Sequence, residues 1–272
     1  MFSSMRTTTK AKPILKWAGG KRALADWLVG RFPGGFARYF EPFLGGGSVL
    51  LELRPEKAII GDRNDWLLDA YEAIRDDHNR VAEILDGLAN TREEFERIRA
   101  IRPEEVGLHQ RAAHLIYLNK TCFRGLFRVN RTGAFNVPYG AYDRRYYDPE
   151  NLEAVAQRLQ GVEIRRGDFE STLADAEADD FVYLDPPYYK LGGFSDFDRY
   201  TKLKFREDDH IRLAALCRRL DARGVRWAVS NSDTPLVREL FEGFRTLNVA
   251  ARREINLNAR GRAVNELLIM NY

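Results

Sequence analysis

Phe181-Val182-Tyr183-Leu184-Asp185-Pro186-Pro187-Tyr188 is an apolar run that ends in a carboxylate, two prolines and an aromatic ring. The run predicts a buried strand, and the prolines predict that the strand ends at Leu184. In doubly wound sheets, ligands bind outside the carboxyl ends of the strands. We therefore expect Asp185, Pro186, Pro187 and Tyr188 to lie at a ligand site on that edge of a sheet.

On both sides of this stretch, strand-like runs alternate with helical ones, which predicts a doubly wound, Rossmann-like α/β sheet. The predicted strands are residues 38–42, 57–61, 161–166, 181–184, 225–230 and 267–272. The predicted helices that follow strands are residues 47–53, 64–75, 208–221 and 234–241.

Strand-like runs are missing between residues 72 and 149, where helical stretches follow one another at residues 79–88, 92–99 and 104–119. A polar and aromatic loop, residues 121–147, comes next, and loops of this length in compact domains are usually functional or disordered. We predict a main domain of residues 1–71 and 150–272, with residues 72–149 as an inserted helical lobe.

The composition is that of a globular protein, with 44% hydrophobic and 31% charged residues. Neither an apolar run near the ~20 residues of a membrane span nor a secretory signal is visible, so we expect a cytoplasmic protein. Two cysteines and four histidines show no metal-ligand spacing, which predicts a site without metal. The 34 arginines against 9 lysines suit phosphates and guanine edges, although arginine usage also follows genome composition.

Asp185 and the residues after it suit one chemistry in particular. An aromatic amino group is a poor nucleophile because its lone pair is delocalised into the ring. Two acceptors, the Asp185 carboxylate and the Pro186 carbonyl, would keep that lone pair localised, and Tyr188 would stack on the ring. Stacking requires the base to leave the duplex, where its amino group is paired. The alternative is that the prolines only turn the chain.

A second ligand-binding pattern lies at residues 39–48, where Tyr-Phe-Glu-Pro-Phe-Leu-Gly-Gly-Gly-Ser leads from a strand through three glycines into a helix. Such a loop lets the backbone approach a nucleotide closely, or simply makes a tight turn. Asp62 follows the next strand, where carboxylates accept from ribose hydroxyls in nucleotide-binding sheets. Asp62 could instead cap the helix that begins near Asn64.

Two further segments complete this pattern. Trp17 and Lys21 flank a Gly-Gly turn, and they would give an apolar wall and a charge partner to a cofactor that carries an adenine and a carboxylate. An ordinary helix entry is the alternative. Asp168 and Phe169 follow another predicted strand and complete the rim of the expected pocket.

In this order, the segments resemble the DNA adenine methyltransferase (Dam) family, in the alpha group of amino-methyltransferases. The matching motifs are K-W-x-G-G-K at residues 16–21, E-P-F-x-G-x-G at 41–47, G-x-F-N-V-P-x-G at 133–140, D-P-P-Y at 185–188, S-N-x-D-T at 230–234 and E-L-L-x-x-N-Y at 266–272. The resemblance implies a site-specific enzyme that transfers a methyl group from S-adenosylmethionine to the exocyclic amino group of a flipped adenine in duplex DNA. The inserted lobe would then recognise the target.

The resemblance also implies roles for individual residues. The implied cofactor contacts are Trp17, Lys21, Glu41, Pro42, Gly45, Gly47, Asp62, Asp168, Phe169 and Asp185. The implied catalytic residues are Asp185, Pro186, Pro187 and Tyr188. The implied DNA contacts are Lys16, Asn119, Phe123, Arg124, Arg128, Asn136 and Pro138.

Residues 119–140 would read the DNA. In the family this segment inserts an aromatic into the duplex, and here Phe123 stands at the aromatic position and Arg128 at a base-reading arginine. Arg124 stands where the GATC-reading members carry Asn. Because arginine prefers guanine edges and asparagine prefers adenine, this departure argues against a GATC target.

The residues of this loop support nucleic-acid binding independently of the family, because arginines alternate with aromatic rings in a way that suits phosphates and bases. Two alternatives remain open. A methyltransferase of cytosine amino groups, RNA or a protein amide would not need residues 119–140, and a catalytically silent DNA-binding relative would be expected to lose Asp185 or Lys21. We expect double-stranded DNA as the partner, a restriction endonuclease as a candidate second partner, and a monomer or weak dimer.

Overall fold

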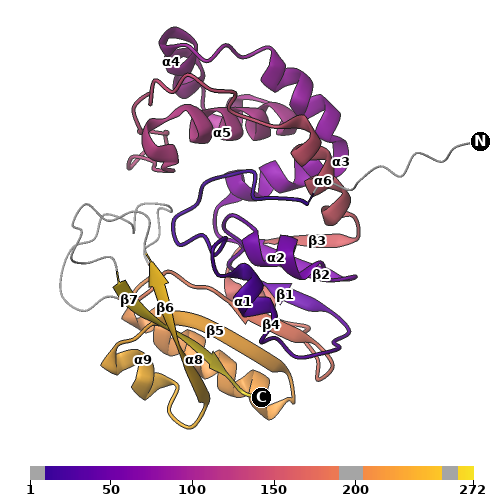
Figure 1. The fold of residues 1–272 in the computed structure, drawn as a ribbon, viewed down its shortest axis with the longest axis vertical. Helices are drawn as coiled ribbons and strands as arrows, with labels where there is room; N and C mark the ends of the chain where they lie inside the picture. Colours follow the sequence, from indigo (N-terminus) through magenta and orange to yellow (C-terminus); the bar gives the residue numbers. More distant parts are fainter. Residues whose placement is uncertain (1–9, 190–204, 253–262) are drawn as a thin grey trace, which may run out of the picture. The chain divides into compact units, whose positions relative to one another are not determined.

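The computed structural model describes residues 10–189, 205–252 and 263–272. These residues divide into two compact units (Figure 1). The helical unit contains the described residues up to Arg22, together with Gly45–Arg54 and Asn64–Val162. The sheet unit contains Ala23–Leu44, Pro55–Arg63 and the described part of Glu163–Tyr272. The predicted division into a main domain and an inserted lobe is a functional one, and it stays a prediction.

The sheet unit is built on a sheet whose described strands have the order β3-β2-β1-β4-β5-β7-β6 (Figure 1). Their bounds are β1 Tyr39–Glu41, β2 Ala58–Asp62, β3 Val162–Arg166, β4 Phe181–Leu184, β5 Arg226–Ser232, β6 Arg245–Arg252 and β7 Ala263–Met270. β2, β1, β4 and β5 are parallel, whereas β7 runs antiparallel to β5 and β6. The predicted doubly wound α/β sheet is confirmed. Its strand order reverses between β1 and β4, which is where such sheets bind ligands.

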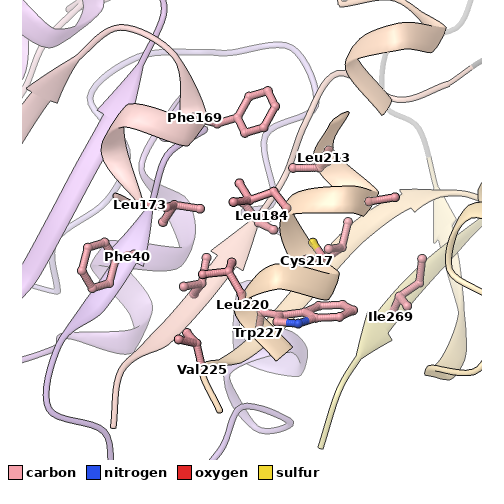
Figure 2. Packing of buried hydrophobic residues seen from close by; sticks show 14 of the residues in the cluster. Phe40, Phe169, Leu173, Leu184, Leu213, Cys217, Leu220, Val225, Trp227 and Ile269 are labelled. Atoms are coloured by element: carbon pink, nitrogen blue, oxygen red, sulfur yellow. The ribbon is translucent and has the colours of Figure 1, made fainter. Parts of the chain in front are cut away.

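Four described helices belong to the sheet unit: α1 Ala25–Val29, α7 Phe169–Thr172, α8 Glu207–Ala222 and α9 Pro235–Leu240. α8 packs on β5 through Leu213, Cys217 and Leu220, which share one face of the helix; Cys217 and Leu220 lie close to the buried indole of Trp227 (Figure 2). Each of the two leucines removed from water stabilises the fold by about 1.5–3 kcal/mol. This core fixes β4 and β5, which carry the candidate site.

The helical unit contains α2 Ser48–Leu53, α3 Asp65–Asp86, α4 Arg92–Ala100, α5 Leu108–Thr121 and α6 Pro149–Leu159, with two short 3-10 turns at Pro103–Glu105 and Phe123–Gly125. α3 packs against both α5 and α6. The predicted break between residues 75 and 79 is a kink inside α3, where Asp77 has φ −156° and ψ 80°. The Asp77 carboxylate accepts from Arg80 N at 3.0 Å and so caps the second half of the helix.

Some elements were not predicted, although the sequence carries signals for them. α6 begins with Pro149 behind the cap residue Asp148, which accepts from Glu150 N at 3.1 Å, and this is a standard start signal. β6 alternates inward Leu247 and Val249 with exposed neighbours, as a half-buried strand does.

No described helix is long and apolar enough to cross a membrane. Among the described residues, no group of three or more His, Cys, Asp or Glu side chains is arranged to hold a metal ion.

His210, in the first turn of α8, should make stability depend on pH. Its imidazole is 2% exposed and lies edge-on to Phe205 and Tyr189, with ring centroids 4.7 and 5.5 Å away. Burial lowers the pKa of His210 to about 4, although Asp209 partly opposes the shift. Because an unfolded histidine binds its proton below about pH 6.5, the unfolded state binds more protons between that pH and 4. The stabilisation is therefore complete above about pH 6.5 and is lost as the pH falls towards 4.

Between about pH 7.5 and about pH 5, we expect the free energy of unfolding to fall by up to about 2 kcal/mol. Urea unfolding at both pH values measures this, and His210→Gln, which stays neutral, should show a smaller fall. An equal fall in the two proteins would show that His210 is not the cause.

Candidate active site

Three carboxylates gather at the carboxyl edge of the central strands of the sheet unit. Glu41 is the last residue of β1, Asp185 follows the last residue of β4, and Glu266 pairs with Ser232 at the end of β5. The carboxyl ends of the parallel strands β1, β4 and β5 lie at the same edge, and the antiparallel β7 brings an early residue there. We call Glu41, Asp185 and Glu266 the acidic edge.

Three tyrosine hydroxyls lie among these carboxylates. Tyr39 donates to Glu41 Oε2 at 2.9 Å, Tyr188 donates to Glu266 Oε2 at 3.1 Å, and the Tyr183 hydroxyl lies 2.8 Å from Ser230 Oγ. Burial is the largest cause that raises the pKa of each phenol well above its ordinary value, and the charge of Asp185 adds to it in all three. The tyrosines therefore stay neutral and serve as hydrogen-bond donors at an edge whose other ionisable groups are carboxyl groups, an arrangement that suits a cation or an amino group.

The Asp-Pro-Pro-Tyr segment leaves β4 at this edge. Asp185 is half-buried, Pro186 is buried, Pro187 is exposed and Tyr188 is half-buried. Asp185 therefore combines proximity to the buried tyrosines with a surface that a ligand can reach. Both prolines fix their own φ angles, which limits the movement of the backbone that follows the carboxylate.

The carboxylates at the ends of β2 and β3 differ in their surroundings. Asp62 is half-buried at the end of β2, and the cap of α3 is Asn64, which accepts from Leu67 N at 3.1 Å. The alternative assignment of Asp62 as that helix cap is therefore wrong. Asp168 caps α7 and forms ion pairs with Arg63 at 2.8 Å and Arg212 at 2.9 Å.

Phe169, the residue after Asp168, is 2% exposed and stacks on Phe43 with ring centroids 5.5 Å apart. The described contacts of Phe169 are thus those of a core residue. A contact with a cofactor remains a prediction for it.

The glycine loop lies in the helical unit, where it leads into α2. Gly45 and Gly47 have φ angles of +48° and +66°, which L residues with a side chain rarely adopt. A Cβ on Gly45 would lie 2.9 Å from Trp17 Cδ1, and one on Gly47 would lie 2.9 Å from the Tyr71 hydroxyl. Tyr71 also donates to Gly45 O at 3.2 Å. Close packing as well as φ therefore requires glycine at both positions.

Trp17 and Lys21 lie in the same unit as this loop. The indole of Trp17 stacks on Phe127, with centroids 5.0 Å apart and an interplanar angle of 26°. Lys21 is 6% exposed, and its ammonium donates to Gly19 O at 2.8 Å across the Gly-Gly turn. The structure thus brings Trp17 and Gly45 into contact and places Lys21 within the turn that follows Trp17.

Residues 121–140, predicted as part of a loop, fold into an irregular hairpin. Phe123 N donates to Pro138 O and Gly140 N to Thr121 O, both at 2.8 Å. Asn130 makes the turn, where its side chain accepts from Thr132 N at 2.9 Å and Ala134 N at 3.0 Å. We call residues 121–140 the hairpin.

Asn119 joins the hairpin to the Lys16 segment. Its carboxamide accepts from Lys16 N at 2.8 Å and donates to Lys16 O at 2.9 Å and to Gly125 O at 3.2 Å. Asn119 has no exposed surface, so in this structure it holds the hairpin rather than offering a group to a ligand. Phe127, at the Trp17 indole, adds a second connection within the helical unit.

The side chains at the start of the hairpin project from it. Phe123 is 47% exposed, which is unusual for a large apolar ring, and the Arg124 guanidinium lies 5.2 Å from its centroid. Arg124 has φ +60° and ψ 6°, and its backbone N–H donates to the Tyr142 hydroxyl at 2.9 Å. The left-handed backbone of Arg124, held by the Tyr142 hydroxyl, is strained, and strained residues of this kind are frequent at binding sites.

Arg128 is held by Asn136 across the hairpin. Its Nε donates to Asn136 Oδ1 at 2.7 Å and its Nη2 to Asn136 O at 3.0 Å. Two bonds from one guanidinium fix its plane, and Arg128 remains half-buried with further donors. The structure therefore brings the predicted residues Arg128 and Asn136 together as a pair.

A basic cluster lies beside the hairpin in the helical unit. Burial lowers the pKa of Lys120 to about 8, and the positive charges of Lys16, Arg144 and Arg22 lower it further. Such mutual repulsion favours binding of an anion that carries several charges. Lys120 and Arg22 were not among the predicted site residues.

A family model described as D12 class N6 adenine-specific DNA methyltransferase matches residues 17–255 of this chain. The chain belongs to this family. It is an adenine-specific DNA methyltransferase, and the resemblance to the Dam family is confirmed.

Similar proteins match the D12 methyltransferase over nearly its whole length. It is 40% identical to Type II methyltransferase M.MjaIII of Methanocaldococcus jannaschii, over 97% of this chain and 100% of that protein. It is 35% identical to Type II methyltransferase M1.LlaDCHI of Lactococcus lactis subsp. cremoris, over 96% and 95% of the two chains. It is also 35% identical to the DNA adenine methylase of Serratia marcescens, over 96% and 98%.

Several residues at the acidic edge of the D12 methyltransferase were not predicted from the sequence, although their positions carry a signal. Tyr39 and Tyr183 stand two residues before Glu41 and Asp185, and residues two apart on a strand share a face. Ser230 opens the S-N-x-D-T motif, for which no role was predicted. Glu266 likewise opens the E-L-L-x-x-N-Y motif, but its place at the acidic edge depends on the direction of β7.

Arg124→Asn tests the reading of DNA by the D12 methyltransferase. Asparagine tolerates a left-handed backbone better than arginine, so we expect the free energy of unfolding to rise by about 0.5–1 kcal/mol. We also expect preference at one base of the target to shift from guanine towards adenine. Thermal unfolding and sequencing of methylated DNA measure the two effects, and an unchanged target sequence would show that Arg124 does not contact that base.

Proposed function

We propose that this enzyme transfers the methyl group of S-adenosylmethionine to the exocyclic amino group of an adenine that has left the DNA duplex. The observation that carries the proposal is the acidic edge. There Asp185 follows the central strand β4 and lies near three neutral tyrosines, next to two prolines and the ring of Tyr188.

The residues present fit S-adenosylmethionine. The acidic edge suits the cationic groups of that cofactor, Lys21 can pair with its carboxylate, and the left-handed Gly45 and Gly47 keep the loop beside Trp17 free of side chains. When bound, S-adenosylmethionine supplies an electrophilic methyl group on sulfur. We assign to it the residues that the family resemblance implies: Trp17, Lys21, Glu41, Pro42, Gly45, Gly47, Asp62, Asp168, Phe169 and Asp185.

The catalytic work of the chain is to prepare the amino nitrogen. One oxygen of Asp185 and the carbonyl of Pro186 accept the two amino protons in hydrogen bonds, which keeps the nitrogen lone pair out of the ring. The rigid Pro186-Pro187 backbone keeps these acceptors in place, and Tyr188 orients the base by stacking. Such alignment lowers the barrier by several kcal/mol. As the nitrogen takes the methyl group, the bond from that carbon to sulfur breaks and a neutral thioether is left. The methylated nitrogen is then positively charged and strongly acidic, so it releases one proton to solvent and no strong base is required.

The hairpin is proposed to read the DNA. The exposed ring of Phe123 enters the duplex, and Arg124 and Arg128 contact base edges, with Asn136 and Pro138 beside them. Lys16 and the rest of the basic cluster contact phosphates. Because Asn119 is fully buried, we assign it the role of holding the hairpin in place. A restriction endonuclease partner, a monomeric or weakly dimeric state and a cytoplasmic location stay predictions.

One experiment separates this proposal from the alternatives. The enzyme is incubated with methyl-labelled S-adenosylmethionine and, in parallel, with genomic DNA free of methylated adenine, the same DNA after heat denaturation, and total RNA. We expect label in the intact duplex and about tenfold less in the other two samples. A single strand cannot place its bases at the hairpin and its phosphates at the basic cluster at the same time. Label in RNA alone, or equal labelling of duplex and denatured DNA, would contradict recognition of a duplex.

A further inference from the structure

The backbone of Tyr189, directly after the Asp-Pro-Pro-Tyr segment, is anchored by β5. Tyr189 N donates to Asn231 Oδ1 at 3.2 Å, and Tyr189 O accepts from Ser232 Oγ. Asn231 has no exposed surface, and its Oδ1 also accepts from Ser232 N at 2.9 Å. Both backbone groups of Tyr189 are therefore held by two consecutive residues of one strand.

The side chain of Tyr188 is held from the neighbouring strand, β7. The Tyr188 hydroxyl donates to Glu266 Oε2 at 3.1 Å, and Glu266 is half-buried opposite Ser232. A tyrosine side chain rotates about Cα–Cβ and about Cβ–Cγ. A hydrogen bond at the hydroxyl limits the first rotation and fixes the place of the ring. Because a phenolic O–H prefers the plane of its ring, the same bond also favours one orientation of the ring plane. Together, Asn231 and Ser232 hold the backbone and Glu266 holds the ring.

A stacking surface must be held in one orientation to align a base for in-line transfer, since small displacements of reacting groups cost much of the rate. Asp185 and Pro186 act on the amino group of the base, and they do not hold the ring of Tyr188 in one orientation. Asn231 and Ser232 belong to the S-N-x-D-T motif, and Glu266 opens the E-L-L-x-x-N-Y motif. The chemistry proposed for the amino group uses neither motif.

We propose that Asn231, Ser232 and Glu266 are positioning residues that fix Tyr188 and Tyr189, and that Glu266 sets the orientation of the stacking ring by accepting from its hydroxyl. The inference rests on the proposed function, in which Tyr188 stacks on the target base. Glu266 acts here as a hydrogen-bond acceptor, so its negative charge is not required.

The test compares Glu266→Leu, which removes the acceptor, with Glu266→Gln, which keeps an acceptor oxygen without the charge. Tyr188→Phe removes the donor but keeps the ring. We expect kcat to fall about tenfold in Glu266→Leu and in Tyr188→Phe with KM for DNA and cofactor unchanged, as for the loss of one buried hydrogen bond. Glu266→Gln should stay within about twofold of the wild type, and the double variant should be no slower than the slower single variant.

A second readout does not depend on activity. Because Tyr189 N–H donates to Asn231, its exchange with solvent deuterium should be slow in the wild type and faster in Glu266→Leu and Tyr188→Phe. Thr246→Ala, an exposed position on β6, is the control and should leave both readouts unchanged.

Three results would overturn the inference: wild-type kcat in Glu266→Leu, equal losses in Glu266→Gln and Glu266→Leu, or additive losses in the double variant. If Glu266→Leu does not fold, Tyr188→Phe decides, and an unchanged kcat in that variant overturns the inference. If the wild type places no label in adenine, the proposed function fails, while the exchange rate of Tyr189 still tests the anchoring.

Discussion

Asp185→Ala is expected to lower kcat about a thousandfold while leaving the affinity for DNA within about twofold. The substitution removes an acceptor for the amino group at the point where the nucleophile forms, whereas the hairpin and the basic cluster of the helical unit are unchanged. Single-turnover transfer of labelled methyl groups measures the first quantity, and a DNA-binding titration without cofactor measures the second.

Two variants bracket this result. Asp185→Asn keeps one acceptor oxygen and should retain more activity than the alanine variant, because the proposed role is acceptance of a hydrogen bond and not removal of a proton. Asp179→Ala, an exposed carboxylate before β4, should behave as the wild type does. Full activity in Asp185→Ala would contradict the proposed chemistry.

Arg128→Ala is expected to lower the preference for the correct target over a single-base variant by up to about a hundredfold. A bidentate contact between an arginine and a guanine accounts for about 1–3 kcal/mol of such discrimination. The structure adds a reason for a large effect, since Asn136 already fixes the guanidinium plane with two hydrogen bonds at 2.7 and 3.0 Å. Ratios of kcat/KM on matched and mismatched duplexes measure it.

Arg131→Ala is the matched control, because Arg131 is an exposed arginine at the turn of the same hairpin. We expect it to weaken binding equally for matched and mismatched duplexes and to reduce the salt dependence of binding. Unchanged discrimination in Arg128→Ala, with binding weakened equally for both duplexes as in Arg131→Ala, would mean that Arg128 contacts only phosphate.

Local sequence signals were sufficient to predict strands whose apolar run is ended by a clear stop signal. β4 was predicted at its observed bounds, because an apolar run meets two prolines there. β6 was missed although exposed residues alternate with the half-buried Leu247 and the buried Val249, and α6 was missed because its proline start was not used. The antiparallel direction of β7 follows from its pairing with β5, which no local pattern shows.

The candidate site divides in the same way. Asp185 was predicted from the residues themselves, because it follows an apolar strand, whereas Glu41 was implied only by the resemblance to the Dam family. The parallel pairing of β1 with β4 brings the two to one edge. The pairing of Arg128 with Asn136 depends on the hairpin that brings residues eight positions apart together. The resemblance to the Dam family implied a DNA contact for Asn119, which stays a prediction, and in the structure tertiary packing buries this residue completely. The contact between Tyr188 and Glu266 joins the segment after β4 to β7, which is distant in the sequence.

The most direct test of the proposed function is the identity of the labelled nucleoside. Duplex DNA labelled by the enzyme with methyl-labelled S-adenosylmethionine is digested to nucleosides, which are separated and identified by mass. We predict that the label lies in deoxyadenosine that carries its new methyl group on the exocyclic nitrogen. Label in deoxycytidine, or on a ring nitrogen of adenine, would contradict the role assigned to Asp185 and Pro186.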